Sequence, residues 1–153
     1  MIRLLPPVLN MFRRKKLDLN YWSIQEKSIL DVCNFKNSIL SVVLEIHPDS
    51  GSLGYADLTV VIKNEGENDL RGIFVMATVT EGFAITNSGQ VFGTSWRMEK
   101  IPTLNTSQKI KYKVVLRSSS RDISGSLAFT LSPTADADDV EAHAIRIPLD
   151  ILS

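Results

Sequence analysis

The chain has 153 residues, the length of about one domain, and 44% of them are apolar against 22% that are charged, as in ordinary globular proteins. Its 17 basic and 17 acidic residues balance, which argues against a dedicated nucleic-acid binder because such proteins carry a basic excess. The single cysteine excludes an intrachain disulfide and leaves the redox compartment open. No apolar run approaches the roughly 20 residues of a membrane-spanning helix, so the composition predicts a soluble globular domain.

The first 16 residues, MIRLLPPVLNMFRRKK, join an apolar stretch to a basic cluster. Pro6 and Pro7 prevent a regular helix across that point. Most basic residues follow the apolar part, whereas a secretory signal carries them in front. The expected location is therefore cytoplasmic if the chain is a complete gene product and the cell surface if it is a fragment. Four basic residues follow in a row: Arg13, Arg14, Lys15 and Lys16. We expect this cluster to be a solvated charged segment, with a patch that binds anionic lipid or nucleic acid as the alternative.

Residues 23–34 carry the signals of one short helix. Ser23 and Glu26 have the spacing of a capping box, and apolar residues follow in partly helical spacing: Ile29, Leu30, Val32 and Cys33. An alternative interpretation makes a short strand of the alternating residues Leu17, Leu19 and Tyr21. The sequence thus predicts an N-terminal extension over residues 1–37, with a basic segment and a helix at about Ser23–Asn34, followed by a domain over residues 38–153.

From Ser38 onward, short alternating apolar runs are separated by turn residues, which is typical of β-strands. Between Tyr55 and Thr80 two such runs flank a polar break, as in two antiparallel strands joined by a tight turn. The second run is apolar on both faces and is predicted to be central, with one face in the core: Ile73, Val75, Ala77 and Val79. No helical crossover separates the runs, so we expect an all-β, antiparallel sandwich of about seven strands, with a barrel as the alternative.

The run Leu58–Gly66, LTVVIKNEG, resembles the "apolar strand, Asn, x, Gly" element of immunoglobulin-like modules such as CARDB domains and related conserved-repeat domains of bacterial and archaeal proteins. The element Ile101–Leu104, followed by Ser107 and the strand at 110–116, is similar to a second element of these modules. The residues Gly125, Leu127 and Phe129 fit their penultimate strand. The resemblance covers about residues 38–150, and it implies an immunoglobulin-like sandwich that acts as a non-catalytic spacer or binding unit.

Residue types that commonly serve in catalysis are few in this sequence and far apart along the chain. The two histidines, His47 and His143, are far apart without the spacing of paired metal ligands. No serine lies in a G-x-S-x-G motif, and Cys33 is expected to be a small buried thiol rather than a nucleophile. The sequence therefore predicts a protein that is not an enzyme and that requires no cofactor.

The densest carboxylate cluster consists of Asp136, Asp138, Asp139 and Glu141. Loops at the end of a sandwich can supply the six to eight oxygen ligands of calcium, but the cluster lacks the glycine and the distal glutamate of the helix-loop-helix calcium loop. We expect a solvated acidic loop first and a weak calcium site second.

The leading functional hypothesis is a non-enzymatic protein–protein interaction or scaffold module, which binds another protein or a second copy of itself. A sheet edge would form the contact, or the N-terminal extension with Trp22 and the cluster Arg13–Lys16. Trp96 would join the contact surface if it is exposed, although packing inside the sandwich is the first expectation for both tryptophans. The alternatives are a calcium- or carbohydrate-binding sandwich and a membrane-peripheral protein anchored by the first 16 residues.

Overall fold

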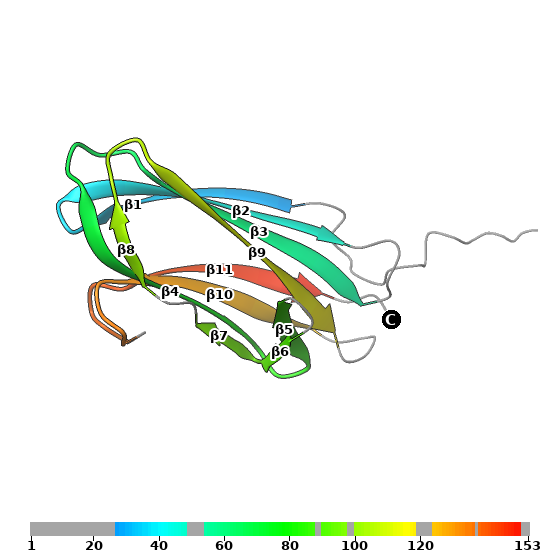
Figure 1. Cartoon of the computed structure of the whole chain (residues 1–153). Helices are drawn as coiled ribbons and strands as arrows, with labels where there is room; N and C mark the ends of the chain where they lie inside the picture. The colour runs from blue at the N-terminus through cyan, green and yellow to red at the C-terminus, as the bar shows by residue number, and fades with distance from the viewer. Residues whose placement is uncertain are drawn as a thin grey trace, which may run out of the picture.

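The computed structural model describes residues 27–48, 54–87, 90–97, 100–118, 124–136 and 138–150, which form eleven strands in two antiparallel sheets (Figure 1). The larger sheet has the order β1-β2-β3-β9-β5-β6, with the bounds β1 Lys27–Phe35, β2 Ser38–Pro48, β3 Tyr55–Asn64, β9 Lys109–Ser118, β5 Phe83–Asn87 and β6 Gln90–Gly93. The smaller sheet has the order β11-β10-β4-β7, with β8 also paired to β4, and the bounds are β11 His143–Asp150, β10 Ser124–Ser132, β4 Leu70–Val79, β7 Ser95–Arg97 and β8 Ile101–Leu104. Within these described residues, no helix is long and apolar enough to span a membrane.

The strand order is that of an immunoglobulin domain. A constant-type domain places strands A, B, E and D in one sheet and G, F and C in the other. Here β2-β3-β9-β5 and β11-β10-β4 follow the same order along the chain and across the sheets. Strand β1 extends the first sheet beyond strand A, and β6 to β8 are short additions between D and E. The prediction of an antiparallel, immunoglobulin-like sandwich is confirmed, and the barrel alternative is wrong because the two sheets stay separate.

The predicted helix at about Ser23–Asn34 is wrong for residues 27–34, which belong to strand β1, while residues 23–26 and the alternative strand at 17–21 lie outside the described residues. Lys36 and Asn37 both have positive φ, 47° and 66°, as a two-residue β-hairpin turn requires. This turn folds β1 back onto β2 and pairs Phe35 with Ser38. The paired strand prevails over the local capping signal because it buries the inward-facing side of β1, which includes Phe35. The described sheet therefore includes Lys27–Phe35, ahead of the boundary expected at residue 38.

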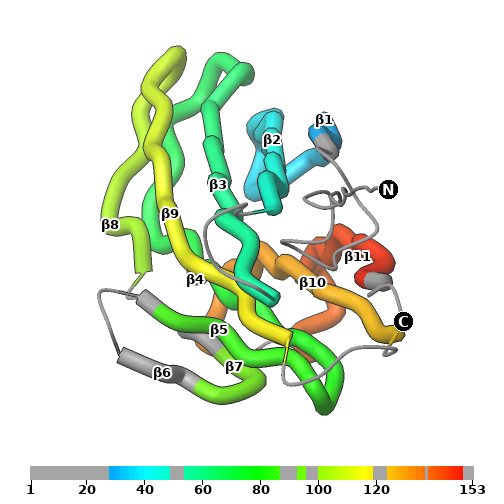
Figure 2. Tube along the Cα trace, turned by 90° about the vertical axis from the view of Figure 1, so that its right-hand side faces the viewer, coloured from blue at the N-terminus to red at the C-terminus, as the bar shows by residue number. Residues whose placement is uncertain are grey.

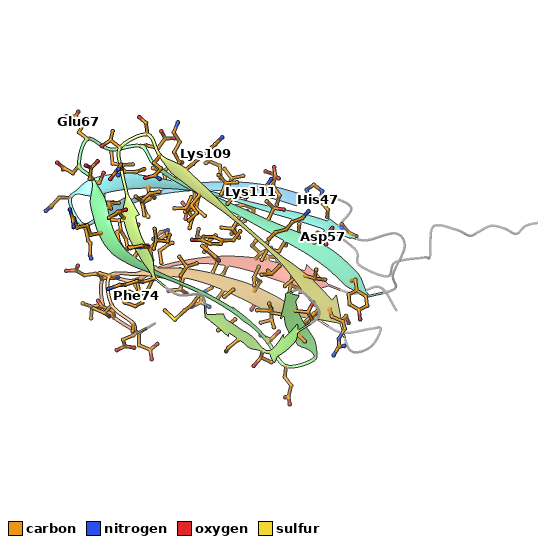
Figure 3. The ribbon with its side chains drawn as sticks, in the orientation of Figure 1. His47, Asp57, Glu67, Phe74, Lys109 and Lys111 are labelled. Carbon is orange, nitrogen blue, oxygen red and sulfur yellow. The ribbon has the colours of Figure 1, made fainter. Side chains whose placement is uncertain are left out.

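The inner faces of the two sheets meet in one apolar core (Figure 3). The inward face of β4 is buried as predicted, with Ile73, Val75, Ala77 and Val79 each at most 6% exposed. Met76, on the opposite face of the same strand, is also only 6% exposed, so this central strand is covered on both sides at that point. Phe129 of β10 is the largest side chain among those that are fully buried.

Candidate interaction surface

The outer face of the six-stranded sheet carries an unusual set of exposed side chains. Side chains of directly paired residues point to the same side of a sheet, and the register therefore defines rows that run across β1, β2, β3 and β9. The first row is Leu30–Val43–Val61–Lys111, the second is Val32–Ser41–Lys63–Lys109, and the third is Ser28–Glu45–Thr59–Lys113.

The β1 end of these rows is apolar. Leu30 is 66% exposed, Val32 56% and Ile39 42%, and these are three of the four large apolar side chains that are exposed among the described residues. Val43 and Val61 continue the patch at intermediate exposure. We call these five residues the apolar corner. Contiguous exposed apolar groups of this kind mark contact surfaces more often than scattered ones do.

The other end of the rows is basic. Lys109, Lys111 and Lys113 are exposed on the outer side of β9, and Figure 3 shows the first two pointing away from the core. We call these three residues the lysine column. Its members are about 6.7 Å apart along the strand, and the column lies about 14 Å from β1, which is three strand spacings. No carboxylate among the described residues forms an ion pair with the column.

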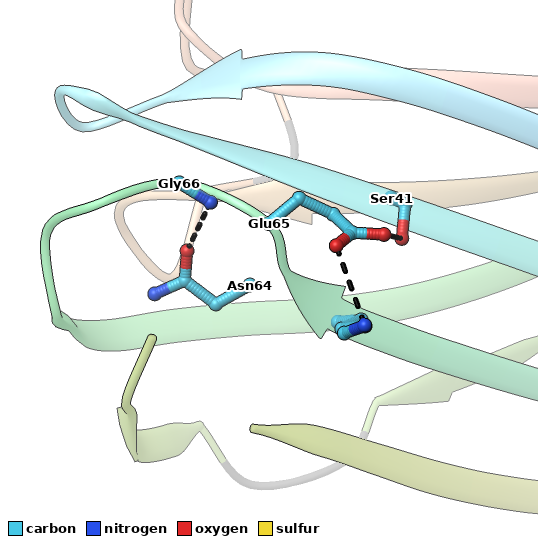
Figure 4. A network of polar contacts seen from close by, with 5 residues as sticks. Ser41, Asn64, Glu65 and Gly66 are labelled. Carbon is cyan, nitrogen blue, oxygen red and sulfur yellow. Dashed lines mark hydrogen bonds and ion pairs between the residues drawn. The ribbon is translucent and has the colours of Figure 1, made fainter. Parts of the chain in front are cut away.

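A buried asparagine fixes the end of this face. The side-chain oxygen of Asn64 accepts a hydrogen bond from the Ser38 hydroxyl at 2.8 Å. It also accepts one from the Gly66 N–H at 3.0 Å (Figure 4). Its Nδ2 donates to the backbone oxygens of Asn68 at 2.8 Å and of Leu104 at 2.9 Å. Four bonds satisfy the amide completely. The side chain thereby joins the start of β2, the β3–β4 loop and the end of β8.

Gly66 is required beside Asn64 for a steric reason. A Cβ atom at this position would lie 2.0 Å from the Ser38 hydroxyl oxygen and 2.7 Å from the backbone nitrogen of Ile39. The next polar contact outward joins Glu65 to the Ser41 hydroxyl at 3.2 Å and to the Lys63 ammonium at 3.4 Å (Figure 4). The "Asn, x, Gly" element is thus explained by packing and hydrogen bonding within the sandwich.

A shallow cleft of about 560 Å³ adjoins the apolar corner at this end of the sandwich. Its lining consists of the β1–β2 hairpin and the β3–β4 loop, and it includes Ile39 of the corner. The described residues that line it include two glutamates, Glu65 and Glu67, and no histidine or cysteine.

The edge of β1 is held by Asp31. One carboxylate oxygen accepts the N–H of Val32 at 2.9 Å, and the other lies 2.7 Å from Nε2 of His143 on β11. Strands β1 and β11 are the edges of opposite sheets on the same side of the sandwich (Figure 2). In the two-residue hairpin, the alternation of ladder bonds turns the Val32 N–H away from β2. Asp31 therefore occupies a backbone donor that an added strand would use.

The predicted metal residues lie together in the loop between β10 and β11, where Asp136 and Asp139 accept local hydrogen bonds. Asp136 accepts the N–H of Asp138 at 2.9 Å, and Asp139 accepts the N–H of Glu141 at 2.8 Å and the Thr134 hydroxyl at 2.9 Å. Across the described residues, no group of three or more His, Cys, Asp or Glu side chains is arranged to hold a metal ion. A calcium site stays a prediction.

The hydrogen bond from the Glu141 N–H, and secondarily that from the Thr134 hydroxyl, lower the pKa of Asp139, while partial desolvation opposes them. A lowered native pKa stabilises the loop above the unfolded pKa, and this contribution is lost as the pH falls through the native value. Amide NMR of Glu141 between pH 2 and 7 should therefore show a midpoint below the ordinary value of about 3.9. Thr134→Val should raise the midpoint, and a midpoint at or above the ordinary value in the unmodified chain would contradict this account.

The remaining candidate residues are dispersed. His47 is the penultimate residue of β2, and His143 begins β11 in the other sheet. Burial, and secondarily the negative charge of Asp31, raise the pKa of the half-buried Cys33 thiol, which leaves little thiolate at neutral pH. Trp96 lies in β7 opposite Ala77, but its side chain is outside the described part of the structure. Trp22 and the cluster Arg13–Lys16 also lie outside the described residues.

Sequence patterns showed one half of this surface and missed the other. The alternation of residues 110–116 indicated a strand with a lysine-bearing outer face, which is the lysine column. The capping pattern predicts a helix for Leu30 and Val32, and it therefore does not indicate their place beside Val43 and Val61. The local signal for this hairpin is Asn37, a residue that tolerates positive φ, between two apolar runs.

No protein-family model matches the chain. A search of curated proteins also gives no significant match. Among solved structures, the chain is similar to the GAE domain of GGA2p from Saccharomyces cerevisiae, with a TM-score of 0.45 and 9% sequence identity over 82% of this chain and 98% of that one. A likeness this distant carries no functional inference, and the resemblance to CARDB domains stays a prediction beyond the immunoglobulin-like sandwich itself.

Proposed function

We propose that this protein is a non-enzymatic interaction module that binds another protein through the outer face of its six-stranded sheet. The observation that carries the proposal is the apolar corner, which gathers Leu30, Val32 and Ile39 on one face. Covering apolar surface is worth about 25 cal/mol per Å², so a partner that covers this corner gains a driving force that scattered residues would not provide.

The outer face of the other sheet supplies a contrast within the same molecule. Its exposed positions on β11 are Ala144, Arg146 and Pro148, and its neighbours on β10 are the small residues Ala128 and Thr130. Among the described residues, none of the four large exposed apolar side chains lies on that face. This asymmetry favours one contact face, and it provides a control surface for experiments.

Site-specific photo-crosslinking in the native cells tests the proposal. A photoreactive amino acid at position 30 of the full chain should give a discrete protein adduct, whereas the same amino acid at position 146 should not. Val32→Ser, introduced together with the crosslinker at position 30, should abolish the adduct without changing the melting temperature. Equal adducts at both positions, or none at position 30, would contradict the proposal.

A further inference from the structure

We propose that the segment of the partner that covers this face is an acidic amphipathic helix. This inference rests on the proposed function, and it specifies the chemistry of the partner at the same surface. The apolar side of the helix would cover the apolar corner, and carboxylates along one flank would face the lysine column.

Charge complementarity selects an acidic partner. The lysine column presents three exposed ammonium groups that have no ion-pair partner among the described residues. The other cation of the three rows, Lys63, already pairs with Glu65 at 3.4 Å. A neutral segment on the apolar corner would leave the charge of the lysine column uncompensated, and a basic segment would be repelled by it. A segment with carboxylates beside the lysine column would be attracted.

The edge of β1 disfavours the simplest alternative, which is addition of a strand. An added strand would need the outward-facing backbone groups of β1, and the Val32 N–H already donates to Asp31. The same carboxylate is also held 2.7 Å from His143 Nε2 on the opposite sheet. Strand addition would therefore have to displace the Asp31 carboxylate from the Val32 N–H, while docking on the face leaves this hydrogen bond intact.

The dimensions of the face suit a helix. A helix is about 10 Å wide, which matches the two strand spacings from β1 to β3, so that its flank reaches toward β9. Residues four positions apart on a helix are separated by about 6 Å, close to the spacing of about 6.7 Å between successive lysines of the column. Val32 and Lys109 lie at the two ends of one row, and Leu30 and Lys111 at the two ends of another. A helix along the strands could therefore make its apolar contacts and its charged contacts side by side.

Binding of two designed peptides to the full chain tests the inference. The first probe is an 18-residue helical peptide with leucines on one face and glutamates along one flank, and the second has lysine at each glutamate position. In NMR titrations the glutamate peptide should shift the amides of Leu30, Val61 and Lys111, and its affinity should fall as salt is raised. The lysine peptide should bind at least tenfold more weakly, by the loss of charge complementarity.

Charge reversal locates the contact. Lys111→Glu with Lys113→Glu should weaken binding of the glutamate peptide roughly tenfold, whereas Arg146→Glu on the outer face of the other sheet should leave it unchanged. Failure of the glutamate peptide to bind, or binding that ignores the reversal, would overturn the inference. A membrane surface would be the partner instead if two results occurred together. The chain would bind phosphatidylcholine vesicles with 30% phosphatidylserine and lose this binding on the same charge reversal, and the glutamate peptide would not bind.

The cellular crosslink separates this inference from the proposed function. An adduct at position 30 that persists at full yield in the Lys111→Glu, Lys113→Glu chain would overturn the acidic partner and leave the contact face standing. Absence of the adduct in the unmodified chain would overturn the contact face itself.

Discussion

Replacement of Asn64 by alanine is expected to lower the free energy of unfolding by about 3 to 5 kcal/mol. The amide is fully buried and makes four hydrogen bonds, two as acceptor and two as donor. Alanine would leave the Gly66 N–H and the Leu104 carbonyl without this partner inside the sandwich, and each such buried group costs about 1 to 3 kcal/mol. The substitution would also remove the side-chain link between the β3–β4 loop and the end of β8.

Urea unfolding followed by circular dichroism measures this effect. Asn34→Ala is the matched control, because Asn34 is an exposed asparagine on β1 and its replacement should change the stability by less than about 0.5 kcal/mol. Asn64→Asp retains an acceptor but removes both donor bonds, so it should also be strongly destabilising. Equal stability of the Asn64→Ala and Asn34→Ala proteins would show that the network does not hold this end of the sandwich.

Replacement of Phe129 by alanine is expected to cost about 3 to 5 kcal/mol, because it removes a large aromatic side chain and leaves a cavity between the sheets. Phe129 is fully buried and pairs with Ala77 on one side and Ile145 on the other. Its neighbours are fixed in two flanking strands and can close around the cavity only in part.

Phe74→Ala is the matched control for this core substitution. Phe74 is only partly buried, on the outer face of β4, with the Lys100 ammonium 5.9 Å from its ring centre. Its replacement should cost less than about 1.5 kcal/mol, mainly through lost contact area. Guanidinium unfolding of both variants measures the two losses of stability. A larger loss for Phe74→Ala than for Phe129→Ala would contradict the assignment of the core.

Much of the fold follows from local patterns. Alternation with period two and the turn residues between runs identify strands β2, β3, β4, β9, β10 and β11, since a strand buried on one face must alternate. The same rule predicts that Ile73 and Val75 lie in the core, where both are fully buried. The basic outer face of β9 was visible for the same reason, because Lys111 and Lys113 alternate with the inward-facing Tyr112 and Val114.

The tertiary structure alone decided the N-terminal strand and the contact surface. Ser23 and Glu26 are local signals for a helix, but the strand at Lys27–Phe35 gains its stability from β2, a neighbour that no capping pattern reveals. The apolar corner exists only because register brings Leu30, Val43 and Val61 into one row. Likewise, the sequence by itself marked Asn64 and Gly66 as a turn, while their partners Ser38 and Leu104 are distant along the chain. A hydrogen bond or a surface row between distant residues has no local periodicity, and it therefore becomes determined only when the sheets have formed.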